Sequence, residues 1–82
     1  MASENDILSV VREIVRGTLK GDMLEDDADI FDAGATSLTV VDLQLQLEER
    51  LNRRAPTHRL MASPSIQGWA TIYSSAQAGP AT

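Results

Sequence analysis

Hydrophobic side chains recur every three or four residues in several stretches of this chain, the spacing typical of amphipathic helices. The first stretch, residues 3–20, has apolar residues at Ile7, Val10, Val11, Ile14 and Val15. Ser3 and Asp6 nearly match a capping box at its start. Lys20 followed by Gly21 suits its end, because a cation favours the last carbonyls and glycine turns left-handed easily. The spacing predicts a helix of about four to five turns.

The segment from residue 22 to residue 35 is acidic and contains no basic residue. Its carboxylates are Asp22, Glu25, Asp26, Asp27, Asp29 and Asp32. We interpret it as a solvated loop that is anchored by Leu24, Ile30 and Phe31, with a short helical turn near residues 29–32. The alternative is a calcium-binding loop, for which Asp27 and Asp29 have the correct spacing. The fifth position of such a loop would be Phe31, which cannot bind calcium, and no glutamate stands at the twelfth position.

The stretch from Ser37 to Leu51 has apolar residues on two opposite sides of one helix when each residue advances by about 100°. One stripe comprises Val40, Leu43, Leu47 and Leu51. The opposite stripe comprises Leu38, Val41 and Leu45, with Asp42, Glu48 and Glu49 beside it. We expect the first stripe in the core with Ile7, Val11, Ile14, Ile66 and Trp69. The second stripe is either packed as well, in a helix sandwiched between neighbours, or part-exposed and bound by partners, which its polar rim favours.

The last part of the chain predicts two further helices. Pro56 ends the preceding element, and residues 57–61 fit one short helical turn. Ser63 and then Pro64 predict the start of the next helix, because serine caps well and proline suits the first position. Ile66, Trp69, Ile72 and Tyr73 follow at helical spacing, although Gly68 weakens this helix by about 1 kcal/mol. We expect one domain over residues 1–76 and a flexible tail of small residues over 77–82.

Composition excludes several classes of function. The 82 residues suffice for one domain, and the net charge of −5 is opposite to the basic patch of a nucleic-acid binder. The absence of cysteine excludes a disulfide framework, a thiolate metal site and a cysteine nucleophile. His58 is the only histidine, and we expect it on the surface rather than in catalysis. No apolar run is long enough to cross a membrane, and the polar N-terminus is unlike a secretory signal, so we expect a cytoplasmic protein.

Ser37 follows a glycine-containing turn, Asp32-Ala33-Gly34-Ala35-Thr36, at the start of the central helix. On local grounds Ser37 is an N-cap, and Thr36 is the alternative cap. The same position also suits a phosphate, because free N–H groups and the helix dipole favour an anion there. No base lies near Ser37 in the sequence, so any chemistry at its hydroxyl needs a base and a metal ion from a partner.

Residues 31–43, from Phe31-Asp32-Ala33-Gly34 through Ser37-Leu38 to Asp42-Leu43, resemble the phosphopantetheine attachment site of acyl and peptidyl carrier proteins. The resemblance covers nearly the whole chain, and the segment from Arg59 to Ile66 also follows the family's order. It implies an all-α fold, an antiparallel four-helix bundle with three main helices and one short helix. It further implies that Ser37 receives 4′-phosphopantetheine from coenzyme A through a magnesium-dependent phosphopantetheinyl transferase, and that the chain has no catalytic activity of its own.

The same resemblance implies a carrier that holds acyl, aminoacyl or polyketide intermediates as thioesters and shuttles them between enzymes. The implied partners are the transferase and the acyltransferase, adenylating or condensing enzymes of a pathway. The protein would act as a monomer, without a nucleic acid or a membrane. The implied partner-binding positions are Leu38, Val41, Asp42, Leu45, Glu48 and Glu49.

Three departures from the family's pattern narrow this expectation. Thr36 stands where members often have Asp or His, and Thr39 stands where fatty-acid carriers have an acid. The third helix, acidic in fatty-acid carriers, here begins Thr57-His58-Arg59. We therefore expect a polyketide or nonribosomal peptide carrier, as in antibiotic biosynthesis. Met1, the single-domain length and the short tails favour a free-standing protein, and the alternative is a domain excised from a megasynthase. The alternative is a small acidic helical adaptor that binds a basic protein without covalent modification and uses Ser37 as a plain cap.

Overall fold

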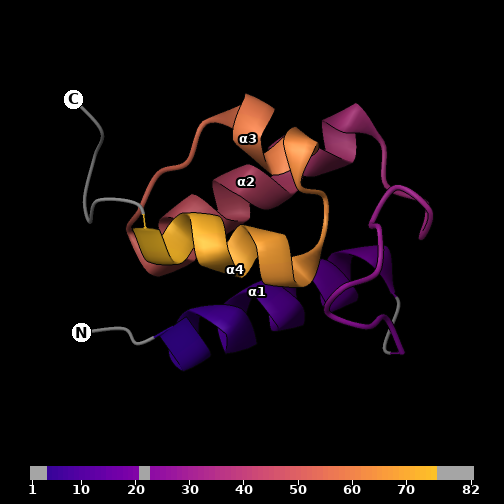
Figure 1. Ribbon diagram of the computed structural model, residues 1–82. Helices are drawn as coiled ribbons and strands as arrows, with labels where there is room; N and C mark the ends of the chain where they lie inside the picture. The colour runs from indigo at the N-terminus through magenta and orange to yellow at the C-terminus, as the bar shows by residue number, and fades with distance from the viewer. Residues whose placement is uncertain (1–3, 21–22, 76–82) are drawn as a thin grey trace.

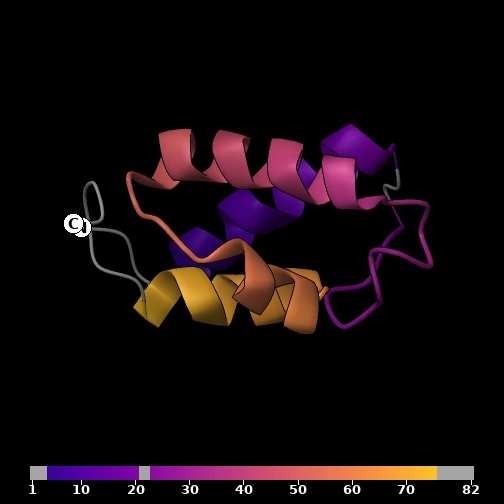
Figure 2. The ribbon, with the colours of Figure 1, turned by 90° about the horizontal axis from the view of Figure 1, so that it is seen from above.

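The computed structural model describes residues 4–20 and 23–75, which form a bundle of four helices. These are α1 (Glu4–Leu19), α2 (Ser37–Leu51), α3 (Thr57–Ala62) and α4 (Ile66–Ser75). Helix α1 packs against α2 and α4, and the short α3 packs against the same two helices (Figure 1). Seen from above, α2 and α4 lie on either side of α1 (Figure 2). The predicted all-α bundle of three main helices and one short helix is thus confirmed. The predicted flexible tail lies outside the described residues.

The core is built from the stripes that the periodicity predicted. Val40, Leu43 and Leu47 of α2 are completely buried, whereas Leu51, in the last turn, is only half-buried against the core. The partners expected for this stripe are all buried: Ile7, Val11, Ile14, Ile66 and Trp69. Trp69 also donates a hydrogen bond of 2.8 Å from Nε1 to the Leu60 carbonyl, which ties α4 to α3.

The acidic loop between α1 and α2 is attached to the bundle along its length. Ile30 is fully buried, and Leu24 and Phe31 pack partly buried against the core, so the three expected anchors are confirmed. Ile30 N–H donates to the Pro64 carbonyl at 2.9 Å. Arg12 pairs with the Asp26 carboxylate through two hydrogen bonds of 2.9 and 2.6 Å. These contacts hold the segment that delivers the chain to the start of α2.

The Arg12–Asp26 pair is expected to make stability depend on pH in the acid range. The hydrogen bond and charge of Arg12 lower the pKa of Asp26 from its ordinary value of 3.8. A lowered folded-state pKa stabilises the fold above about pH 4, and this contribution disappears as the pH falls through the folded-state value. Asp26→Asn should therefore be less stable than the wild-type protein at pH 7, and the two should converge as the pH falls below the lowered pKa of Asp26 in the folded state. Chemical denaturation across this range measures the difference, and a constant difference at every pH would contradict the pair's contribution.

Two helix ends differ from their predicted positions. Ser3 and Gly21 lie outside the described residues. Helix α1 ends at Leu19, one residue before the predicted end, and Lys20 has a left-handed φ of 55°. Ser63 does not cap α4. It ends α3, where its N–H donates to the Arg59 carbonyl at 3.2 Å. Ser65 takes the capping position instead, and its Oγ accepts the Gly68 N–H at 2.9 Å.

Glycine is required at position 68 by this close turn between α3 and α4. A Cβ atom there would collide with Ser63 Oγ and lie 2.9 Å from the Ser63 carbonyl oxygen. The helix-weakening effect of Gly68 is therefore the cost of bringing α4 close to the end of α3.

Candidate functional site

Ser37 is the first residue of α2, at the end of the bundle where the acidic loop meets this helix (Figure 2). A hydrogen-bonded turn over residues 30–34 precedes it, close to the short helical turn predicted near residues 29–32, with Ala33 N–H donating to the Ile30 carbonyl at 3.1 Å. Gly34 then takes φ 108°, a left-handed conformation that glycine adopts without steric cost. Ala35 is buried and Ser37 is exposed. The turn therefore anchors the chain just before Ser37 and leaves the serine in solvent.

The N-cap of α2 is Thr36, so the local interpretation of Ser37 as the cap is wrong. Thr36 Oγ1 accepts the Thr39 N–H at 3.2 Å, and Thr39 Oγ1 accepts the Thr36 N–H at 3.1 Å. Thr36 has the extended backbone that a cap requires, whereas Ser37 is already helical. The Ser37 hydroxyl is therefore free of the capping role and faces solvent.

The surroundings of Ser37 fit a covalently attached phosphate. Thr39 N–H donates to Thr36 Oγ1, and Val40 N–H donates to the Thr36 carbonyl. The N–H groups of the first two helical residues, Ser37 and Leu38, have no acceptor within the helix. These groups and the helix dipole favour a negative charge on a side chain at position 37. No charged residue occurs between Asp32 and Asp42, so no carboxylate from this stretch repels a phosphate.

The second stripe of α2 is exposed, which settles the choice between a sandwiched and a free helix face. Leu38 is 83% exposed, Val41 42% and Leu45 60%. Asp42 and Glu49 are exposed beside them. Glu48 differs from the other five positions implied for partner binding, because its side chain is only 16% exposed. The second stripe of α2 is thus an exposed apolar surface with carboxylates beside it, and it begins next to Ser37.

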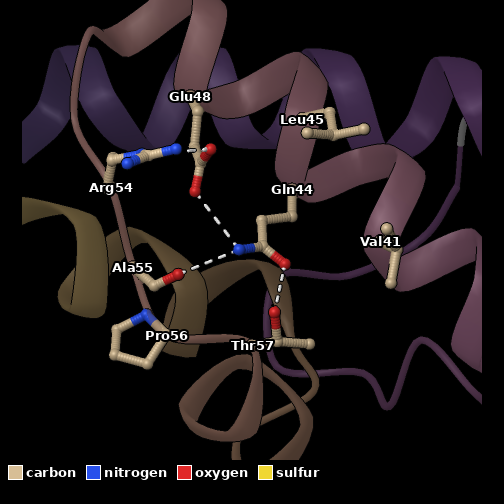
Figure 3. Close-up of a pocket in the computed structure, with 8 residues that line it drawn as sticks. All are labelled: Val41, Gln44, Leu45, Glu48, Arg54, Ala55, Pro56 and Thr57. Atoms are coloured by element: carbon tan, nitrogen blue, oxygen red, sulfur yellow. Dashed lines mark hydrogen bonds and ion pairs between the residues drawn. The ribbon is translucent and has the colours of Figure 1, made fainter. Parts of the chain in front are cut away.

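A groove of about 500 Å³ lies beside this stripe, between α2 and the segment that leads into α3 (Figure 3). Gln44 spans it: its Nε2 donates to the Ala55 carbonyl at 3.0 Å and its Oε1 accepts the Thr57 hydroxyl at 2.6 Å. Glu48 accepts a second bond from Gln44 Nε2 at 3.2 Å and pairs with Arg54 at 3.8 Å. The sequence did not predict this groove, because the contacts that form it link residues far apart along the chain.

His58 is exposed on α3, as expected, and no group of three metal-ligating side chains converges within residues 4–20 and 23–75. Burial raises the pKa of the Tyr73 phenol above its ordinary value of 10.0. None of the helices in the described ranges is long and apolar enough to span a bilayer.

Comparison with known families gives one match, over residues 9–72, to the family described as the phosphopantetheine attachment site. The match covers more than three quarters of the 82-residue chain and includes the turn, Ser37 and both stripes of α2. Among curated protein sequences no significant match is found.

Proposed function

The chain belongs to the phosphopantetheine attachment site family, and from this premise we propose that Ser37 is the residue that carries 4′-phosphopantetheine. The support is the exposed hydroxyl of Ser37, which Thr36 releases from capping, at a helix N-terminus that favours a phosphate. Neighbouring hydroxyls are less suitable, because Thr36 and Thr39 bond to each other's backbone.

The modification needs chemistry that this chain lacks. Ser37 Oγ bonds to the phosphorus that bears pantetheine in coenzyme A, and the bond from this phosphorus to the bridging oxygen breaks. Adenosine 3′,5′-bisphosphate leaves with that oxygen, and the Ser37 proton passes to a base of the transferase. A magnesium ion held by the transferase would stabilise the charge on the phosphates. The contribution of the chain is to present the hydroxyl without steric hindrance.

The attached arm would supply a terminal thiol that holds acyl, aminoacyl or polyketide groups as thioesters. In this proposal the chain is a non-catalytic, monomeric carrier in the cytoplasm, with its carrier domain over residues 1–76. It shuttles intermediates between the acyltransferase, adenylating or condensing enzymes of a polyketide or nonribosomal peptide pathway. The uncharged residues Thr36 and Thr39 and the basic start of α3 support such a pathway over fatty-acid synthesis.

The exposed stripe of α2 is the proposed docking surface for these enzymes. Asp42 and Glu49 would attract a basic partner over a distance, an effect that salt screens. Leu38, Val41 and Leu45 would then lose their exposed apolar area against the partner, which supplies the binding energy at the centre of an interface. Glu48, turned toward the groove, would contribute at the edge of this surface.

Intact mass tests the proposal. Incubation with coenzyme A, magnesium and a broad-specificity phosphopantetheinyl transferase is expected to add the mass of one phosphopantetheine, and peptide mapping is expected to place it on Ser37. The control omits the transferase and should leave the mass unchanged. If several such transferases leave the mass unchanged, the carrier function is wrong and the adaptor alternative gains support.

A further inference from the structure

We propose that Thr36 and Thr39 are positioning residues for group transfer to Ser37, acting as a pair of hydroxyls that fixes the first turn of α2. This inference rests on the proposed function, because it concerns the rate at which Ser37 is modified. It assigns to two uncharged residues a part in the reaction beyond that of an ordinary helix cap.

The two threonines enclose Ser37 in a closed set of hydrogen bonds. Each side-chain oxygen accepts the backbone N–H of the other residue, at 3.2 and 3.1 Å, and the two oxygens are themselves 3.1 Å apart. One hydroxyl therefore donates to the other, and all three bonds join position 36 to position 39. Ser37 and Leu38 lie between the joined positions, so their backbone has little freedom while the pair is intact.

The turn on the N-terminal side of the pair holds the backbone, but its glycine adds no side-chain restraint near Ser37. Gly34, at φ 108°, lies two residues before Thr36, and a Cβ atom at Gly34 would meet no neighbouring atom. Buried anchors flank the region at Ala35 and Val40, but Ser37 itself is exposed. The hydroxyl pair is therefore the main side-chain restraint on the direction in which Ser37 points.

Charge does not replace this restraint. The stretch from Ala33 to Val41 contains no ionisable side chain, so none of these residues offers a transferase a charge with which to orient Ser37. The carboxylates of Asp42 and Glu49 lie further along α2 and act on capture of the partner. Capture of the transferase is thus assigned to Asp42 and Glu49, and orientation of Ser37 to the two threonines. Substitutions of the carboxylates should therefore change KM, and substitutions of the threonines should change kcat.

The test is steady-state kinetics of modification with a broad-specificity transferase, coenzyme A and magnesium. Thr36→Val and Thr39→Val each remove one hydroxyl with little change of shape, and each should lower kcat about fivefold or more with KM nearly unchanged. The double variant should lose about as much as either single variant, because the hydroxyls act as a unit. Thr36→Ser and Thr39→Ser keep the hydroxyls and should restore kcat. Asp42→Lys should instead raise KM.

Ser65→Ala is the matched control. It removes a serine cap from α4, where Ser65 Oγ accepts the Gly68 N–H at 2.9 Å, and should lower stability by an amount similar to that of Thr36→Val. If the threonines matter only through overall stability, Ser65→Ala will lower kcat as much as Thr36→Val does. That result, or wild-type kcat in both valine variants, or a failure of the serine variants to restore kcat, would overturn the positioning role. A wild-type protein that no transferase modifies would overturn the proposed function and this inference together.

Discussion

Ser37→Ala is expected to take up no phosphopantetheine while it retains the fold and nearly the full stability of the wild-type protein. The loss should be complete because the substitution removes the oxygen that we propose to bond to phosphorus. The fold is retained because Ser37 is exposed and Thr36, not Ser37, caps α2. Alanine is a strong helix former, so the free energy of unfolding should change by less than about 0.5 kcal/mol. Intact mass after transferase treatment and thermal unfolding of the same sample measure both quantities.

Ser9→Ala is a suitable control, because Ser9 is an exposed serine on α1, away from the start of α2. It should take up one phosphopantetheine as the wild-type protein does. If Ser37→Ala still gains this mass, the attachment residue is a different hydroxyl. If Ser37→Ala loses 1 kcal/mol or more of stability, Ser37 contributes to the helix start in a way that its exposed position does not explain.

The sequence predicted the two stripes of α2 because their origin is local. The angle between successive side chains on a helix is fixed, so spacing alone separates Val40 and Leu47 from Val41 and Leu45. It could not decide whether the second stripe was buried, since this depends on the helices that pack around α2. The structure settles that question, with Leu45 60% exposed and Leu47 completely buried.

The helix starts were harder to predict because two suitable capping residues stood close together in each case. Thr36 precedes Ser37, and Ser65 follows Ser63, and all four are good caps by residue type. At α4 tertiary contacts decide between the two serines: Ser63 ends α3, and the Pro64 carbonyl accepts the Ile30 N–H from the acidic loop. At α2 the choice is local, because Thr36 and Thr39 bond to each other's backbone. The groove that Gln44 spans was not predicted either, because the hydrogen bonds of Gln44 with Ala55 and Thr57 join α2 to the segment that leads into α3.

Leu47→Asp and Val41→Asp are expected to separate stability from partner binding, although both introduce the same carboxylate into α2. Leu47 is completely buried, and its replacement by alanine alone should cost about 2–5 kcal/mol. An aspartate there also buries an unpaired charge, so Leu47→Asp should leave the protein largely unfolded at room temperature. Val41 is 42% exposed, so Val41→Asp should change the free energy of unfolding by about 1 kcal/mol or less.

Binding of the transferase should follow the opposite order to stability, with a larger effect at Val41 than at Leu47. Val41→Asp places a charge in the middle of the exposed stripe, where an enzyme that docks there would have to bury it, so the KM for modification by a transferase should rise. Leu47→Ala is the control for folded variants: if it remains folded, it should be less stable than Val41→Asp and yet be modified with a KM near that of the wild-type protein. Thermal unfolding and transferase kinetics on the same preparations give both orders. If Val41→Asp unfolds as completely as Leu47→Asp, both stripes contribute to the core and the docking surface lies elsewhere. If it stays folded and its KM is unchanged, the transferase does not use the middle of this stripe.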